Sequence, residues 1–191
     1  MKRLVVLLGL IGFTPLTSQA AVTINEIAWM GGSSSANQEW IELYNDGGSV
    51  NVDDWSLSDG NSLNVSLNGT LSANGFVVLE RTSDDSAPGT AFLIYTGALN
   101  NGGTTLTLRR SDGGIEDQVS GGENWENLGG DNVTKATAQY TTSGWITADP
   151  TPGSVNSNAP VQTTSSPNST GSSYLATPVE RESEKLILPG V

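Results

Sequence analysis

Short apolar runs alternate with glycine-rich turns along most of the chain. The most regular run spans residues 39–46, where Ile41 and Leu43 share one face of an extended backbone and Trp40 and Glu42 share the other. This alternation predicts a β-strand, and because neither face is purely polar, the strand is expected in the middle of a sheet with material on both sides. Its carboxylates then need partners or access to solvent.

The same pattern predicts strands before and after this run. The first spans residues 22–29, with Ile24 and Glu26 on one face and Ile27 on the other, and a Gly/Ser-rich loop follows it. Further strands are expected at 50–58, 63–67, 76–80, 92–95, 106–109 and 115–119, with a last strand from 137–140 and Trp145. The turn Asp112-Gly113-Gly114 predicts a hairpin. Strands at intervals of roughly 8 to 14 residues, without helical periodicity, indicate an all-β sandwich or barrel.

The two ends of the chain differ in composition from the part between them. A basic start, an apolar run and the pattern Ser18-Gln19-Ala20 predict a signal peptide over residues 1–20, and therefore an exported protein that is extracellular, on the cell surface or periplasmic. Residues 158–191 begin with a Ser/Thr/Pro-rich stretch and predict a disordered linker or stalk. One domain is expected over residues 21–157, and no transmembrane segment is expected after the signal peptide.

Charge restricts the class of partner. Without Lys2 and Arg3 of the signal peptide the chain has 6 basic and 20 acidic residues, a net charge of −14. Nucleic-acid affinity comes largely from Lys and Arg that neutralise phosphates. The predicted domain contains few of them, namely Arg81, Arg109, Arg110 and Lys135. The sequence therefore argues against nucleic acid and anionic membranes, and we expect a protein or a cell-surface polysaccharide as partner.

The residue types present limit the chemistry. The chain has no His and no Cys, which excludes a Ser-His-Asp triad, a Cys nucleophile and a His/Cys zinc site. A carboxylate pair for glycoside hydrolysis stays open among Glu26, Glu39 and Glu42, because that reaction needs two carboxyl groups across a sugar cleft. Strand glutamates more often pair with Arg or with backbone groups. No catalytic residue and no enzymatic activity are therefore expected.

Two other groups of residues are candidates for binding. Asp53, Asp54 and Asp59 place oxygen ligands near one strand end, which suits Ca²⁺, although Asp before Gly is also ordinary turn chemistry. No other cofactor is expected. Trp125 lies among Glu and Asn residues in a Gly-rich loop, so it is the tryptophan expected to be exposed, where its ring could stack on a sugar.

Several of these segments resemble the lamin tail domain family. They are Ile24-Asn25-Glu26-Ile27, Glu39-Trp40-Ile41-Glu42-Leu43 and Trp55-Ser56-Leu57-Ser58-Asp59, and residues 150–156 resemble the closing segment of the family. The resemblance covers nearly all of residues 21–157. It implies an immunoglobulin-like β-sandwich of the type found in exported bacterial proteins, without agreed catalytic residues, that serves as a binding or tethering unit.

We therefore expect an exported, non-enzymatic module for binding, adhesion or assembly. Two alternatives stay open at this point. The chain could be a carbohydrate-binding module, or the accessory domain of a secreted hydrolase whose catalytic part is absent from this sequence.

Overall fold

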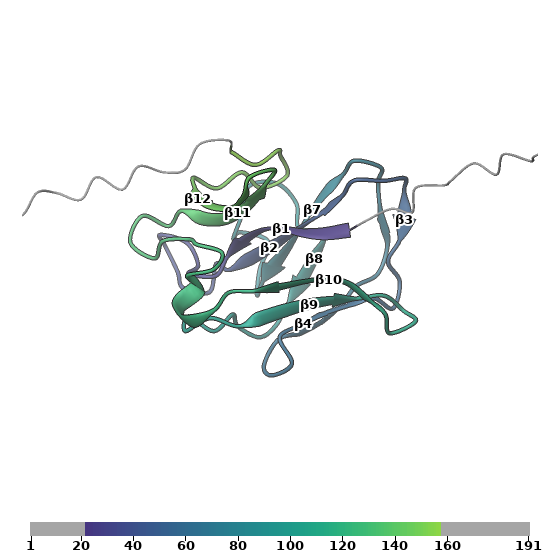
Figure 1. Cartoon of the computed structure of the whole chain (residues 1–191), viewed down its shortest axis with the longest axis horizontal. Coiled ribbons are helices and arrows are strands. Elements are labelled where there is room, and N and C mark those ends of the chain that lie inside the picture. The colour runs from purple at the N-terminus through teal and green to yellow at the C-terminus, as the bar shows by residue number, and fades with distance from the viewer. Residues whose placement is uncertain (1–21, 158–191) are drawn as a thin grey trace, which may run out of the picture. The chain divides into compact units, whose positions relative to one another are not determined.

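The computed structural model describes residues 22–157, which form a β-sandwich of immunoglobulin-like type (Figure 1). The all-β prediction is confirmed. A six-stranded sheet has the order β12-β11-β1-β2-β7-β8, a four-stranded sheet has the order β10-β9-β4-β5, and β3 pairs with β6 in a small third sheet. The strands are β1 Val22–Ala28, β2 Trp40–Asn45, β3 Val50–Asn51, β4 Ser56–Ser58, β5 Asn64–Ser66, β6 Thr70–Leu71, β7 Phe76–Arg81, β8 Leu93–Tyr95, β9 Thr105–Arg109, β10 Ile115–Ser120, β11 Thr137–Thr141 and β12 Gly144–Ala148. The predicted signal peptide and linker lie outside the described residues.

β2 lies between β1 and β7, in the interior of the larger sheet. Ile41 and Leu43 are buried on the face toward the four-stranded sheet, and Trp40 and Glu42 are buried on the opposite face, which we call the outer face. The sheet is therefore covered on both sides at this strand, as its sequence predicts.

β1 contains a bulge that the sequence does not reveal. Its register with β2 skips Asn25, between Ile24 and Glu26. One extra residue reverses the alternation of the residues that follow it. Ile24 and Ile27 are therefore buried on the same face, while Glu26 lies on the outer face directly opposite Glu42 of β2. The prediction that Ile24 and Glu26 share a face is wrong for this reason.

Residues 50–58 form two strands instead of the single strand predicted. Between β3 and β4 the backbone N–H of Trp55 donates to the carbonyl of Val52 at 3.1 Å, and Asp54 has a φ of 63°. This turn allows β3 to pair with β6, which the sequence did not predict, while β4 joins the four-stranded sheet. The predicted single strand is therefore divided into β3 and β4, which belong to different sheets.

The end of the domain also differs from the prediction. β11 and β12 form an antiparallel hairpin in place of one last strand, with Gly144 at a φ of 103° where β12 begins. β7 and β8 pair in parallel. The predicted strands that correspond to β5, β7, β8, β9 and β10 are confirmed, as is the hairpin between β9 and β10. No helix among residues 22–157 is long and apolar enough to cross a membrane.

Candidate functional site

Residues 149–157, which we call the closing segment, follow β12 and fold back over the outer face of β1 and β2. The backbone N–H of Thr151 donates to Glu26 Oε1 at 3.0 Å, and its hydroxyl donates to Glu26 Oε2 at 2.8 Å. The N–H of Gly153 donates to Glu42 Oε2. Asn156 Nδ2 donates to the carbonyl of Asn25 at 2.9 Å. The two strand glutamates are thus among the acceptors that hold this segment in place.

Glu26 and Glu42 are each 0% exposed and lie opposite each other on neighbouring strands. Burial raises the pKa of Glu42 to about 7, against the opposing effect of the hydrogen bonds from Gly153 and Asn25. The charge of Glu26 raises this pKa further. Burial also raises the pKa of Glu26, although Thr137 and Thr151 donate hydrogen bonds to its carboxylate. Ionisation of this pair is therefore costly in the folded protein.

Glu39 has a different set of partners. Arg81 Nη1 lies 3.0 Å from Glu39 Oε1, and the backbone N–H of Leu99 donates to Glu39 Oε2 at 2.8 Å. Burial raises the pKa of Glu39, while the Leu99 hydrogen bond and Arg81 oppose this shift. The prediction that the strand glutamates pair with Arg or backbone groups is confirmed. Because all three carboxylates are enclosed, none of them faces a cleft in which a sugar could bind between two acids.

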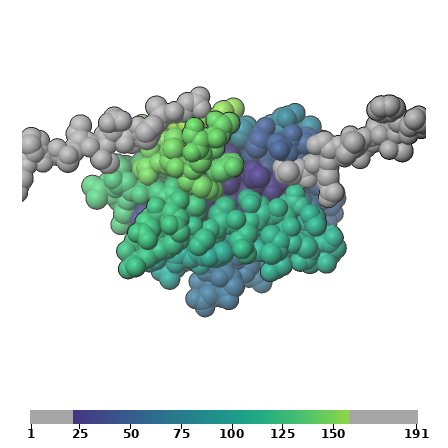
Figure 2. Space-filling model, viewed as in Figure 1, coloured from purple at the N-terminus to yellow at the C-terminus, as the bar shows by residue number. Residues whose placement is uncertain are grey.

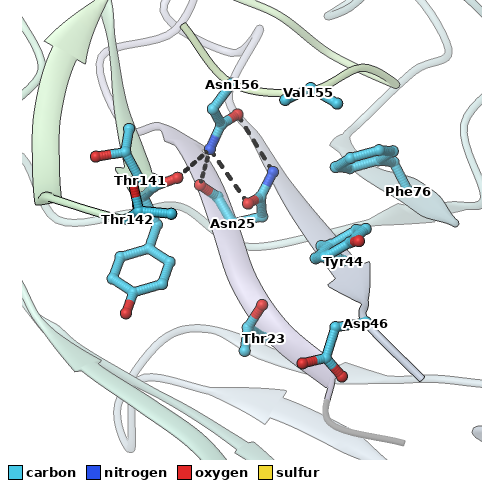
Figure 3. Close-up of a pocket in the computed structure, with 10 residues that line it drawn as sticks. Thr23, Asn25, Tyr44, Asp46, Phe76, Thr141, Thr142, Val155 and Asn156 are labelled. Carbon is cyan, nitrogen blue, oxygen red and sulfur yellow. Dashed lines mark hydrogen bonds between the residues drawn. The ribbon is translucent and has the colours of Figure 1, made fainter. Parts of the chain in front are cut away.

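An open pocket of about 380 Å³ lies beside the enclosed glutamates (Figure 3). In Figure 3, Asn25 and Asn156 meet at one end, Tyr44 and Phe76 line one side, and Thr141 and Thr142 stand on the side opposite. Figure 2 shows purple atoms of β1 between the green C-terminal strands and the blue segments of the chain. The pocket is lined by Thr23, Asn25, Tyr44, Asp46, Phe76, Tyr140, Thr141, Thr142, Val155 and Asn156.

The pocket combines rings, amides and hydroxyls. Tyr44 and Phe76 are cross-strand neighbours whose ring centroids are 4.5 Å apart at an interplanar angle of 25°. Asp46 is the acidic side chain of the lining, which contains no Lys or Arg. Val155 and Asn156 belong to the closing segment, so this segment forms part of the wall of the pocket. Such a lining suits a neutral polar ligand with an apolar face.

Two of the three candidate calcium ligands accept hydrogen bonds from backbone N–H groups in turns. Asp53 Oδ1 accepts from the N–H of Gly69 at 2.6 Å, and this hydrogen bond, with one from Asn51, holds the pKa of Asp53 below its ordinary value. Asp59 Oδ1 accepts from the N–H groups of Asn61 and Leu63. In the described part of the chain, no three acidic side chains are grouped so that they could hold a metal ion.

Asp54 is an exposed residue in the turn between β3 and β4. The three aspartates therefore do not form a calcium site together in the described part of the chain. Calcium binding stays a prediction.

Trp125 is buried, and the prediction that it is exposed is wrong. It is 0% exposed, its ring stacks on Trp29 with centroids 5.9 Å apart, and its Nε1 donates to the carbonyl of Asn100 at 2.8 Å. The 3₁₀ turn η1 (Glu123–Trp125) has positive φ at Asn124 and at Trp125 itself, which turns the ring inward. Gly121 leaves room for it, because a Cβ there would lie 2.7 Å from the ring. The ring has no face available for a ligand.

The pocket residues were not identified as a site from the sequence. The available signal was Tyr44, an aromatic ring on the outer face of the central strand. Its partner Phe76 and the amides of Asn25 and Asn156 come from other segments, so only the folded structure brings them together.

The Lamin Tail Domain family model matches residues 15–123, more than half of the 191-residue chain. The matched region includes β1, β2 and β7, and so contains both enclosed glutamates and the two stacked rings of the pocket. β11, β12 and the closing segment follow it. A comparison with curated proteins found no match. The family resemblance inferred from the sequence motifs is confirmed.

Proposed function

The chain belongs to the lamin tail domain family, and from this premise we propose that it is an exported, non-enzymatic binding module that serves adhesion or assembly. The contrast between two parts of the outer face carries this proposal. Glu26 and Glu42 are enclosed, with both oxygens of each hydrogen-bonded, whereas the pocket beside them is open. An accessible pocket whose neighbouring carboxylates are enclosed favours ligand binding over catalysis.

Export is supported by the N-terminal sequence. The basic start, the apolar run and Ser18-Gln19-Ala20 have the order of a signal peptide. Expression of the full chain in a bacterium, followed by N-terminal sequencing of the exported fraction, tests this part of the proposal. The mature protein is expected to begin at Ala21. Accumulation of the uncleaved chain inside the cell would contradict export.

Binding is tested with the labelled mature chain on intact cells of its native host. Saturable binding that unlabelled protein displaces is the expected result. Leu43→Asp, which places a charge in the core between the sheets, is the control for adsorption of unfolded protein. Wild-type binding that never saturates, or that equals the binding of Leu43→Asp, would contradict the proposed adhesive role.

A carbohydrate-binding module is the second candidate. The observation that favours it is the lining of the open pocket, which offers aromatic rings, amides and hydroxyls without a basic residue. Sugars present both hydroxyl groups and apolar ring faces, so a surface of this composition can contact both.

A further inference from the structure

The stacked rings of Tyr44 and Phe76 form a small aromatic surface on the outer face of the sheet. They face each other across β2 and β7, with centroids 4.5 Å apart, and both are half-buried. Paired rings on adjacent strands are held in fixed positions by the sheet itself. A ligand that contacts them therefore meets a surface that is already ordered, which lowers the entropic cost of binding.

The amides at the other end of the pocket are also fixed. Asn156 Nδ2 donates to the carbonyl of Tyr140 at 2.7 Å and to that of Asn25 at 2.9 Å. Asn25 Nδ2 donates to Glu42 Oε1 at 2.7 Å. These bonds occupy the amides and give that end of the pocket a rigid shape. Thr23 is half-buried, Thr142 is exposed and both line the pocket, so their hydroxyls can pair with polar groups of a ligand.

Charge and size restrict the class of ligand. The pocket lining contains no Lys or Arg, and the chain has a net charge of −12, so an anionic ligand would be repelled. The volume of about 380 Å³ falls in the range of small-ligand sites. A cationic side chain could contact the rings and Asp46. Asp46, however, already takes part in an interaction within the protein, and most of the polar lining consists of uncharged hydroxyls and amides. The composition favours a neutral ligand that has hydroxyl groups and apolar faces.

We propose that the pocket between the Tyr44–Phe76 pair and the closing segment binds a neutral saccharide unit. This inference rests on the carbohydrate-binding candidate above and assigns its site. The rings of Tyr44 and Phe76 contact the apolar face of the sugar, and the hydroxyls of Thr23 and Thr142 pair with its hydroxyl groups. Val155 and Asn156 close the pocket from the side of the closing segment.

The test is isothermal titration calorimetry of the full mature chain with cellohexaose and chitohexaose as neutral probes and hexalysine as a cationic probe. Saturable binding of a neutral oligosaccharide is expected. Tyr44→Ala is expected to weaken it about tenfold or more, because the variant removes one ring of the pair. Phe76→Leu should weaken binding as well. Phe92→Leu, at a half-buried position outside the pocket, is the matched control and should bind like wild type.

A second variant tests the pocket even if Tyr44→Ala fails to fold. Thr142 is exposed in the turn between β11 and β12, so Thr142→Val removes a pocket hydroxyl without touching the core. It should keep the wild-type melting temperature and bind the oligosaccharide several-fold more weakly.

The outcomes separate the site from the function. Oligosaccharide binding that survives in Tyr44→Ala, Phe76→Leu and Thr142→Val would overturn the site and leave the carbohydrate-binding candidate standing. Absence of binding to both neutral probes would overturn the site and the candidate together. Binding of hexalysine that Tyr44→Ala abolishes, without binding of the sugars, would overturn the saccharide assignment in favour of a basic peptide.

Discussion

Glu42→Gln is expected to remove much of the dependence of the domain's stability on pH between about pH 5 and about pH 8. Glu42 is fully buried and accepts hydrogen bonds from Asn25 Nδ2 and from the N–H of Gly153. Gln has nearly the same shape and keeps one oxygen acceptor, but it cannot ionise. The variant therefore removes the ionisation at nearly constant side-chain volume; it also loses one of the two accepted hydrogen bonds, which shifts the stability by a similar amount at every pH and leaves the pH dependence as the readout.

The sign and size of the effect follow from the pKa. Burial raises the pKa of Glu42 from 4.5 in the unfolded chain to about 7 in the folded protein. Between these values the folded state binds more protons than the unfolded state, so the free energy of unfolding falls as the pH rises. The stability is complete below the unfolded pKa and is lost as the pH passes through the folded pKa. The difference between the two pKa values corresponds to about 3 kcal/mol.

Urea denaturation at a series of pH values and constant ionic strength measures this effect. Wild type is expected to lose about 3 kcal/mol of unfolding free energy through Glu42 as the pH rises across this window. Glu26 and Glu39, whose pKa values are also raised, add to the loss with the same sign. Glu126→Gln removes one charge from an exposed loop position and is the matched control, since it reports general charge repulsion only. Wild-type stability that rises toward pH 8, or an unchanged slope in Glu42→Gln, would refute the reasoning.

Three further predictions concern the core, the acidic turns and the closing segment. Trp125→Ala should lower the free energy of unfolding by about 3 to 5 kcal/mol in urea denaturation, as a large core truncation; a change below about 1 kcal/mol would contradict its packing role. If Ca²⁺ binds specifically, sub-millimolar Ca²⁺ should raise the melting temperature in about 0.15 M salt and Asp59→Asn should remove the shift. Equal stabilisation by Mg²⁺ and by added NaCl would instead indicate screening of a solvated acidic face. Truncation after Ala148 should lower the melting temperature and abolish oligosaccharide binding, because it removes Thr151 and Gly153, which donate hydrogen bonds to Glu26 and Glu42, and one wall of the pocket; an unchanged melting temperature would contradict this.

The position of β2 in the interior of the sheet could be predicted because the signal for it lies within the strand's own sequence. Ile41 and Leu43 alternate with Trp40 and Glu42, and a strand with apolar residues on both faces must be covered on both sides. The bulge in β1 could not be predicted in this way. Asn25 is the extra residue only in relation to the register with β2, and a register is a property of two paired strands.

Trp125 shows a second limit of local reasoning. Its Glu, Asn and Gly neighbours are typical of an exposed loop, and those neighbours are indeed largely exposed. The side chain nevertheless points inward, because positive φ values at Asn124 and Trp125 reverse the direction that the composition indicates. The space it fills is made by Gly121 and by Trp29, which is far away in the sequence. Composition predicts the exposure of a loop but not the direction of each of its side chains.

The buried glutamates and the pocket are parts of one arrangement. Glu26 and Glu42 would be unfavourable in an isolated sheet at neutral pH, since two carboxylates lie directly opposite each other on neighbouring strands. In the folded domain they accept hydrogen bonds from the backbone N–H groups of Thr151 and Gly153. Apolar residues at the two positions would leave those donors without partners and would remove the attachments of Thr151 and Gly153 to the sheet. Because Val155 and Asn156 of that segment line the pocket, the residues that lower stability at neutral pH are the same ones that fix the shape of the proposed binding site.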